Sequence, residues 1–152
     1  MENNNLIEKK QKKKIYTIGR VGFASVIWGP LAWVYLISKN FDFFWKITYA
    51  KNTLIYGISS SLLLLTFFVM LPEVIWNKIP NNIVPIVIVS AISAFMSAYQ
   101  NTLITSHLNE GWGKQSGWKV TWIAILFWLL TFLYAMLVYI IVYEVLQLDF
   151  LV

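Results

Sequence analysis

Few residues in this chain carry side chains that could do chemistry, and their types exclude most kinds of site. The sequence has no Cys and a single His, His107, so it offers no thiolate and too few ligands for a zinc or haem site. Glu110 follows three residues later, and the two could form an interfacial polar site. The sequence nominates no nucleophile beside them. We therefore expect no catalytic residue, no metal and no cofactor, and we favour a protein that is not an enzyme.

A row of small and polar residues recurs at helical spacing in the third apolar stretch of the chain. Its members are Ser90, Ala94, Ser97, Asn101 and Thr105. Residues three and four apart share one face of a helix, and small residues there let two helices approach closely. We interpret the row as an intramolecular helix-packing face. A polar ligand groove and a self-association surface are the alternatives.

The densest cluster of charge lies in a basic tail, residues 1–20, that we expect to be cytoplasmic. It comprises Lys9, Lys10, Lys12, Lys13 and Lys14. Each Lys beside an anionic leaflet contributes about 1 kcal/mol of binding free energy, so we predict that these side chains contact lipid headgroups. No recognition helix or aromatic platform accompanies the run, so nucleic acid is not an expected partner.

The segments that carry these residues are apolar enough to lie in a bilayer. Of the 152 residues, 59% are hydrophobic and 12% are charged, against about 25% charged in soluble domains. Four uncharged windows cover 21–38, 53–71, 83–106 and 120–143, and the last three have the length of a spanning helix. All seven carboxylates lie outside them, which argues against a proton- or ion-coupled carrier. We assign 21–152 to a single helical membrane domain.

The first window is interrupted by Gly29 and Pro30, and the distribution of Lys and Arg bears on whether it crosses. If it crosses, the two sides of the membrane carry seven and five of these residues; if it enters and returns, the division is eleven against one. We therefore predict an all-α integral membrane protein with three transmembrane helices after a broken re-entrant or interfacial segment. Its N-terminus is cytoplasmic and its C-terminus outside. Four transmembrane helices are the alternative. The aromatic stretch 41–49 is expected to lie at headgroup level.

Two short motifs occur at the ends of the segment 20–112. The first is Gly29, Pro30, Trp33 and Tyr35, and the second is Asn101, His107 and Leu108 followed by Gly111 and Trp112. The pair resembles motifs of the small bacterial membrane proteins grouped as domain of unknown function 2628. The first motif departs from that family's Gly-Pro-x-Trp-x-x-Tyr because Trp33 falls one place late. The resemblance implies a multi-pass bacterial protein of the inner (plasma) membrane, with no established activity.

These features favour an integral membrane scaffold or accessory subunit of a membrane complex. The hypothesis requires a protein partner or a second copy of the chain, held in the bilayer. One alternative is an oligomeric small-solute or lipid transporter or channel, with a path lined by Ser90, Ser97, Asn101 and Thr105. A weaker alternative is a membrane enzyme that uses His107 and Glu110 at the interface.

Overall fold

Helices make up nearly all of the fold. A computed structural model describes residues 14–80 and 83–145. Its elements are β1 (Lys14–Ile15), α2 (Ile18–Trp28), α3 (Pro30–Phe43), α4 (Ile47–Val69), α5 (Glu73–Trp76), α6 (Ile83–Tyr99), α7 (Asn101–Asn109), β2 (Gly113–Lys114), α8 (Gly117–Tyr139) and the π-helical turn η1 (Ile140–Val145). The segments Ile47–Val69 and Gly117–Glu144 are long and apolar enough to span a membrane, and the bent pair α6 and α7 makes a third if it is one span. The predicted all-α membrane fold is confirmed.

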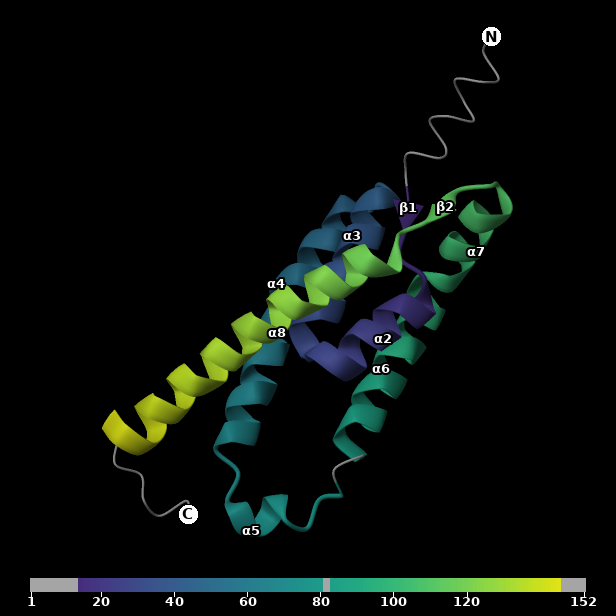
Figure 1. Cartoon of the computed structure of the whole chain (residues 1–152). Coiled ribbons are helices and arrows are strands. Elements are labelled where there is room, and N and C mark those ends of the chain that lie inside the picture. Colours follow the sequence, from purple (N-terminus) through teal and green to yellow (C-terminus); the bar gives the residue numbers. More distant parts are fainter. Residues whose placement is uncertain (1–13, 81–82, 146–152) are drawn as a thin grey trace.

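The first apolar window folds into a helical hairpin of α2 and α3 (Figure 1). Gly29 separates the two helices at φ 88°, in the left-handed region that glycine adopts without steric cost. Pro30 then begins α3, where its fixed φ suits a first helical turn. The 11 residues of α2 and 14 of α3 reach about 16 Å and about 21 Å, too short to cross about 30 Å of hydrocarbon. The segment is therefore broken and returns, as predicted.

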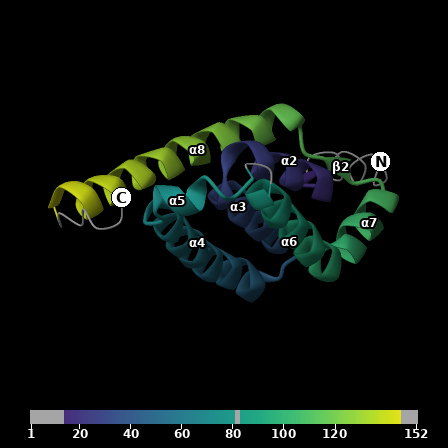
Figure 2. The same ribbon diagram turned by 90° about the horizontal axis from the view of Figure 1, so that it is seen from below.

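The longer helices surround this hairpin. α4 packs mainly on α3, α6 packs mainly on α2, and α8 lies across both arms. Seen from below, α8 lies on one side of the hairpin and α4 and α6 lie on the other (Figure 2). The hairpin therefore supplies much of the buried core. Its fully buried apolar side chains include Val21, Ala24, Ala32, Leu36 and Ile37.

A left-handed residue ends α3 and redirects the chain into α4. Trp45 has φ 60°, and its N–H donates to the Asp42 carbonyl at 3.1 Å while the Lys46 N–H donates to the Phe41 carbonyl at 2.9 Å. This pair of bonds is a common C-cap that satisfies the last carbonyl groups of a helix. Residues 41–49 therefore end α3, turn and begin α4. That this stretch lies at headgroup level stays a prediction.

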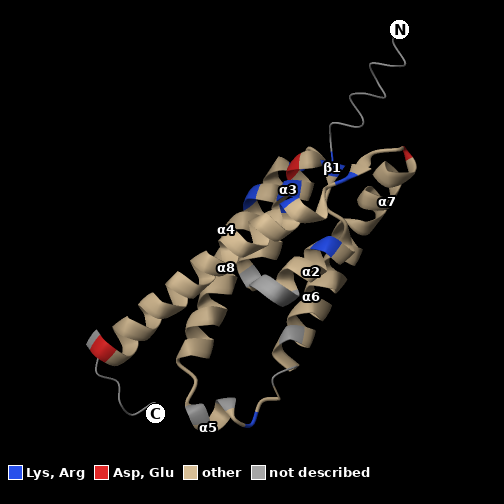
Figure 3. Ribbon diagram, viewed as in Figure 1, with Lys and Arg blue, Asp and Glu red and all other residues tan. Residues whose placement is uncertain are grey.

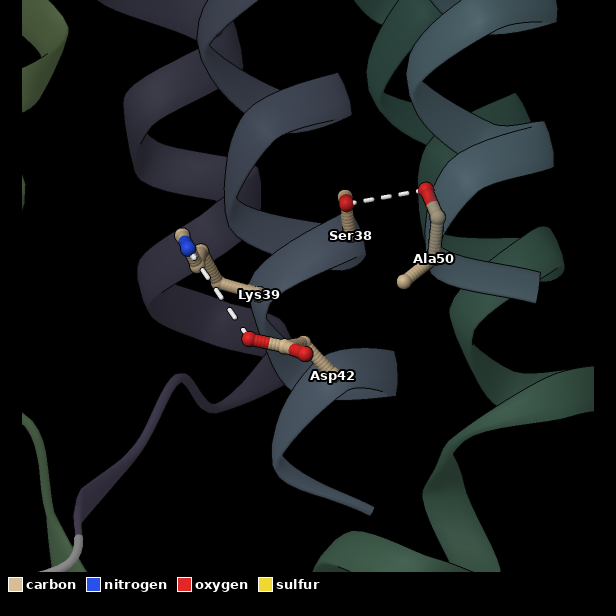
Figure 4. Close-up of polar contacts among 4 residues, drawn as sticks. All are labelled: Ser38, Lys39, Asp42 and Ala50. Atoms are coloured by element: carbon tan, nitrogen blue, oxygen red, sulfur yellow. Dashed lines mark hydrogen bonds and ion pairs between the residues drawn. The ribbon is translucent and has the colours of Figure 1, made fainter. Parts of the chain in front are cut away.

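Side chains reinforce the same joint. Ser38 Oγ donates to the Ala50 carbonyl at 2.9 Å and so ties α3 to the first turns of α4 (Figure 4). Lys39 Nζ lies 3.9 Å from Asp42 Oδ2, with both side chains about half exposed (Figure 4). Such an exposed pair contributes little to stability, so the buried serine bond is the stronger constraint.

The third apolar window is not one straight helix. α6 ends at Tyr99, α7 begins at Asn101, and the two axes differ by 63°. Between them the buried Gln100 donates from Nε2 to the Ile37 carbonyl of α3 at 3.0 Å. The backbone of Gln100 departs from helical geometry at φ −125° and ψ −19°, and its side-chain bond to α3 holds the bend. The helical span predicted over 83–106 is therefore bent at Gln100, and this bend was not predicted from the sequence.

A buried amide network joins this bend to the end of the hairpin. Asn40 Nδ2 donates to Gln100 Oε1 at 3.1 Å and to the Tyr16 carbonyl at 2.7 Å. The Tyr16 N–H in turn donates to Asn40 Oδ1 at 3.0 Å. Both amide side chains are 0% exposed, so neither can exchange these bonds for water. The network fixes the segment after β1, the end of α3 and the bend relative to one another.

Replacing Gln100 by Leu should lower the free energy of unfolding by about 2–3 kcal/mol, because the Asn40 amide and the Ile37 carbonyl lose a partner in the core. Denaturant titration in detergent micelles measures the change. Asn101→Leu is the matched control, since the neighbouring amide is exposed and its loss should cost less than about 0.5 kcal/mol. Unchanged stability of the Gln100 variant would contradict the role given to this network.

Candidate functional site

The small-residue row lies on the surface of the chain. Its members, Ser90, Ala94, Ser97, Asn101 and Thr105, are all exposed. α6 is buried through other side chains, including Ile92 and Met96. The bend at Gln100 also places the last two members of the row on a separate helix. The row therefore makes no intramolecular packing face in the described chain, and its use by a ligand or a second chain stays a prediction.

His107 lies in an aromatic cluster beside the α3–α4 joint. Its ring centroid is 5.6 Å from that of Phe43, 4.9 Å from Phe44 and 5.7 Å from Trp112. Nδ1 lies 3.0 Å from the Leu103 carbonyl oxygen, so Nδ1 carries the proton and donates it. The imidazole thus anchors the end of α7 to the end of α3.

Glu110 is bound by its own neighbours. Its carboxylate accepts a hydrogen bond from Ser106 Oγ at 3.3 Å and another from Trp112 Nε1 at 3.2 Å. Both are exposed, short-range bonds that order the loop after α7. A shared chemical role for His107 and Glu110 stays a prediction. Within 14–80 and 83–145, no three His, Asp or Glu side chains gather as metal ligands would.

The first motif lies in the hairpin turn and the start of α3. A Cβ at Gly29 would stand 3.7 Å from the side chain of Thr131 on α8, so the turn packs closely against that helix. Tyr35 packs on Phe127 of α8 with ring centroids 5.3 Å apart. Trp33, in contrast, lines a hollow together with side chains of α4 and α6. The side chain of Pro30 lies outside those described.

Headgroup contact by the basic tail also stays a prediction. Lys9, Lys10, Lys12 and Lys13 lie outside the described residues. Lys14 is exposed in β1, which pairs in parallel with β2. The Gln115 N–H donates to the Ile15 carbonyl at 2.8 Å, and the Arg20 guanidinium donates to the Gln115 carbonyl. These bonds fix the beginning of the described chain to the loop before α8.

An apolar groove runs between α4 and α6. It consists of two adjoining hollows of about 330 Å³ and 450 Å³, and Trp33, Ser60 and Phe95 line both. Because α4 packs on α3 and α6 on α2, Trp33 of α3 lies between the two walls. The remaining lining residues are Phe41, Tyr49, Asn52, Thr53, Tyr56, Gly57, Ser61 and Leu64 with Ile88, Ala91, Ile92 and Tyr99. Hollows of this size are typical of sites for small apolar ligands.

Trp33 lines the groove, but its polar atom is enclosed by the protein. Its indole Nε1 is buried and has no hydrogen-bond partner among the described residues. Buried Trp N–H groups usually find an acceptor, so this unpaired group is an exception among the described residues.

The polar core residues were missed by sequence reasoning, although a signal for them exists. Gln100 lies inside the uncharged window 83–106, and Asn40 lies two residues beyond the window 21–38. A primary amide inside an apolar segment must find a partner once buried, so two such amides are candidates to bind each other. The groove has no comparable signal, because it depends on how the hairpin separates α4 from α6.

No family model, curated protein or solved structure matches this chain. Membership of the family named domain of unknown function 2628 therefore stays a prediction. The function must be argued from the surfaces of the molecule itself.

Gly57 lets α4 approach α3 beneath the groove. A Cβ at this position would lie 2.7 Å from Val34 Cγ1, so Gly57→Ala should destabilise the fold by about 1–3 kcal/mol. Thermal unfolding in detergent measures the loss, and adding Val34→Ala should restore much of it. Gly19→Ala is the control, because nothing lies within 4 Å of its added Cβ. Equal stability of the two alanine variants would disprove the close approach.

Proposed function

We propose that this chain is a small integral membrane scaffold or accessory subunit that binds a transmembrane helix of another subunit. The observation that carries the proposal is the exposure of Ser90, Ala94 and Ser97 on an otherwise apolar helix. In lipid, helices associate through close packing and hydrogen bonds, and small residues permit both. At 100° per residue, the row lies opposite the groove-lining Ile88 and Phe95 on α6. A partner helix on the row would therefore leave the groove open.

We further propose that the protein lies in the bacterial inner (plasma) membrane with a cytoplasmic N-terminus and three spans. Support comes from the charge distribution: Lys and Arg gather at the end formed by β1, β2 and the α3–α4 joint, whereas the opposite end near α5 carries a single Lys among the described residues (Figure 3). Cytoplasmic ends of membrane proteins are enriched in Lys and Arg. The bacterial source follows the resemblance described above.

An alkaline phosphatase fused after Val152 should be active in intact cells, because three spans bring the C-terminus to the outer side. A green fluorescent protein at the same place should be dark if exported unfolded. The control is a fusion after Gly113, in the basic loop that this topology keeps in the cytoplasm. There the phosphatase should be inactive and the green fluorescent protein should be fluorescent. A fluorescent C-terminal fusion would contradict three spans.

A single cysteine at Ala94 should cross-link to a neighbouring helix in native membranes, and the chain has no other Cys to give background. Mass spectrometry of the product distinguishes a second copy from a different subunit. Leu133→Cys on α8 is the matched control, since its side chain is also exposed but outside the row. The proposal fails if both positions give the same products in the same yield.

A further inference from the structure

We propose that the groove between α4 and α6 binds one acyl chain of an anionic phospholipid from the leaflet at the basic end of the molecule. This site is distinct from the outer row on α6 and does not depend on the subunit function proposed above. The argument rests on the length, width, polarity and charge of the groove.

The groove has the length of one leaflet. Along α4 its lining extends from Tyr49 to Leu64, which at 1.5 Å per residue is about 22 Å. Half of a bilayer, headgroups included, is about 20–22 Å thick. A lipid chain that enters at one end would therefore finish near the bilayer centre.

The groove is too narrow for a helix. The hollow of about 450 Å³ extends along three turns of α4, from Tyr49 to Ser60. A helix with its side chains is about 10–12 Å across and needs several times this volume over the same length. A single hydrocarbon chain suits the available width.

Polarity changes along the groove as it does along a lipid. Tyr49, Asn52 and Tyr99 line the end near the α3–α4 joint. Leu64, Ile88 and Ile92 line the other end. Tyrosine side chains favour the level of the headgroups, and aliphatic side chains favour the acyl region. The two ends therefore match the polar and apolar ends of one amphiphile.

A cation and a helix N-terminus stand at the polar mouth. Lys46 precedes Tyr49 by one turn on the same face, and its Nζ lies 5.6 Å from the Tyr49 ring centroid. The 23-residue helix α4 begins just after it, at Ile47, with no side-chain cap for its first N–H groups. A phosphate at this place would accept bonds from these N–H groups and pair with Lys46. Lys51 lies on another side of α4, and Lys39 is paired with Asp42.

The first test fills the groove. Native mass spectrometry of protein released from phosphatidylglycerol-containing nanodiscs measures the phospholipid retained per chain. Ala91→Phe, on the groove wall, should lower retention at least fivefold. Ser97→Phe puts the same side chain about 120° around α6 from Ala91, on the outer row, and should leave retention unchanged while it weakens cross-linking to a partner. Equal retention by the two variants and the wild type would overturn the lipid site without touching the subunit proposal.

The second test removes the charge at the mouth. In nanodiscs with equal phosphatidylglycerol and phosphatidylcholine, the wild type should retain the anionic lipid preferentially. Lys46→Gln should reduce this preference about fivefold, the effect of one Lys at a membrane surface. Lys51→Gln carries the same loss of charge at the same end and should keep most of the preference. No preference in the wild type, or equal loss in both variants, would overturn the assignment.

A third measurement needs no variant and so does not depend on folding of Ala91→Phe. Phosphatidylglycerol with a photoactivatable acyl chain should label peptides of α4 and α6 that carry Tyr56 and Phe95 several-fold more than peptides of the exposed α8. Uniform labelling of all exposed helices would mean that only bulk lipid surrounds the protein.

Discussion

The hydrogen bond between the side chains of Asn40 and Gln100 is the interaction on which the rest of the structure depends. Both amides are fully buried in the protein, so no water replaces a lost partner. The bonds of Asn40 to the Tyr16 backbone hold the end of α3 beside the beginning of the hairpin. The bond of Gln100 to the Ile37 carbonyl holds the bend between α6 and α7. One polar contact thus sets both the return of the hairpin and the break in the third apolar segment.

The hairpin in turn decides which surfaces are open. Because α2 and α3 are inserted between the long helices, α4 and α6 pack on different arms and leave the groove between them. The outer side of α6, with Ser90, Ala94 and Ser97, is left exposed. The joint after α3 brings Lys46 to the mouth of the groove and Phe43 and Phe44 to His107. A short hairpin therefore organises the two surfaces for which we propose a partner helix and a lipid chain.

Much of the architecture could be predicted from composition and charge, because lipid restricts a chain to few solutions. The Gly29–Pro30 break and the uneven Lys and Arg distribution were sufficient to predict a returning segment. The bend at Gln100 was missed because apolar windows record hydrophobicity and not the partners of a buried amide. The row around Ala94 was assigned to internal packing because its spacing fits any neighbouring helix, and spacing does not say which helix is present. Trp33 was found as part of a motif, but its place in a groove follows only from tertiary packing.

The return of the hairpin is tested most directly by cysteine labelling at its two ends. The chain has no Cys of its own, so Lys14→Cys before α2 and Lys51→Cys after α3 each carry a single reporter on an exposed side chain. A membrane-impermeant maleimide is added to sealed right-side-out and inverted vesicles. The re-entrant structure predicts that both positions are labelled only in inverted vesicles. Labelling of the two positions from opposite sides would show that the first segment crosses the membrane and would contradict the account.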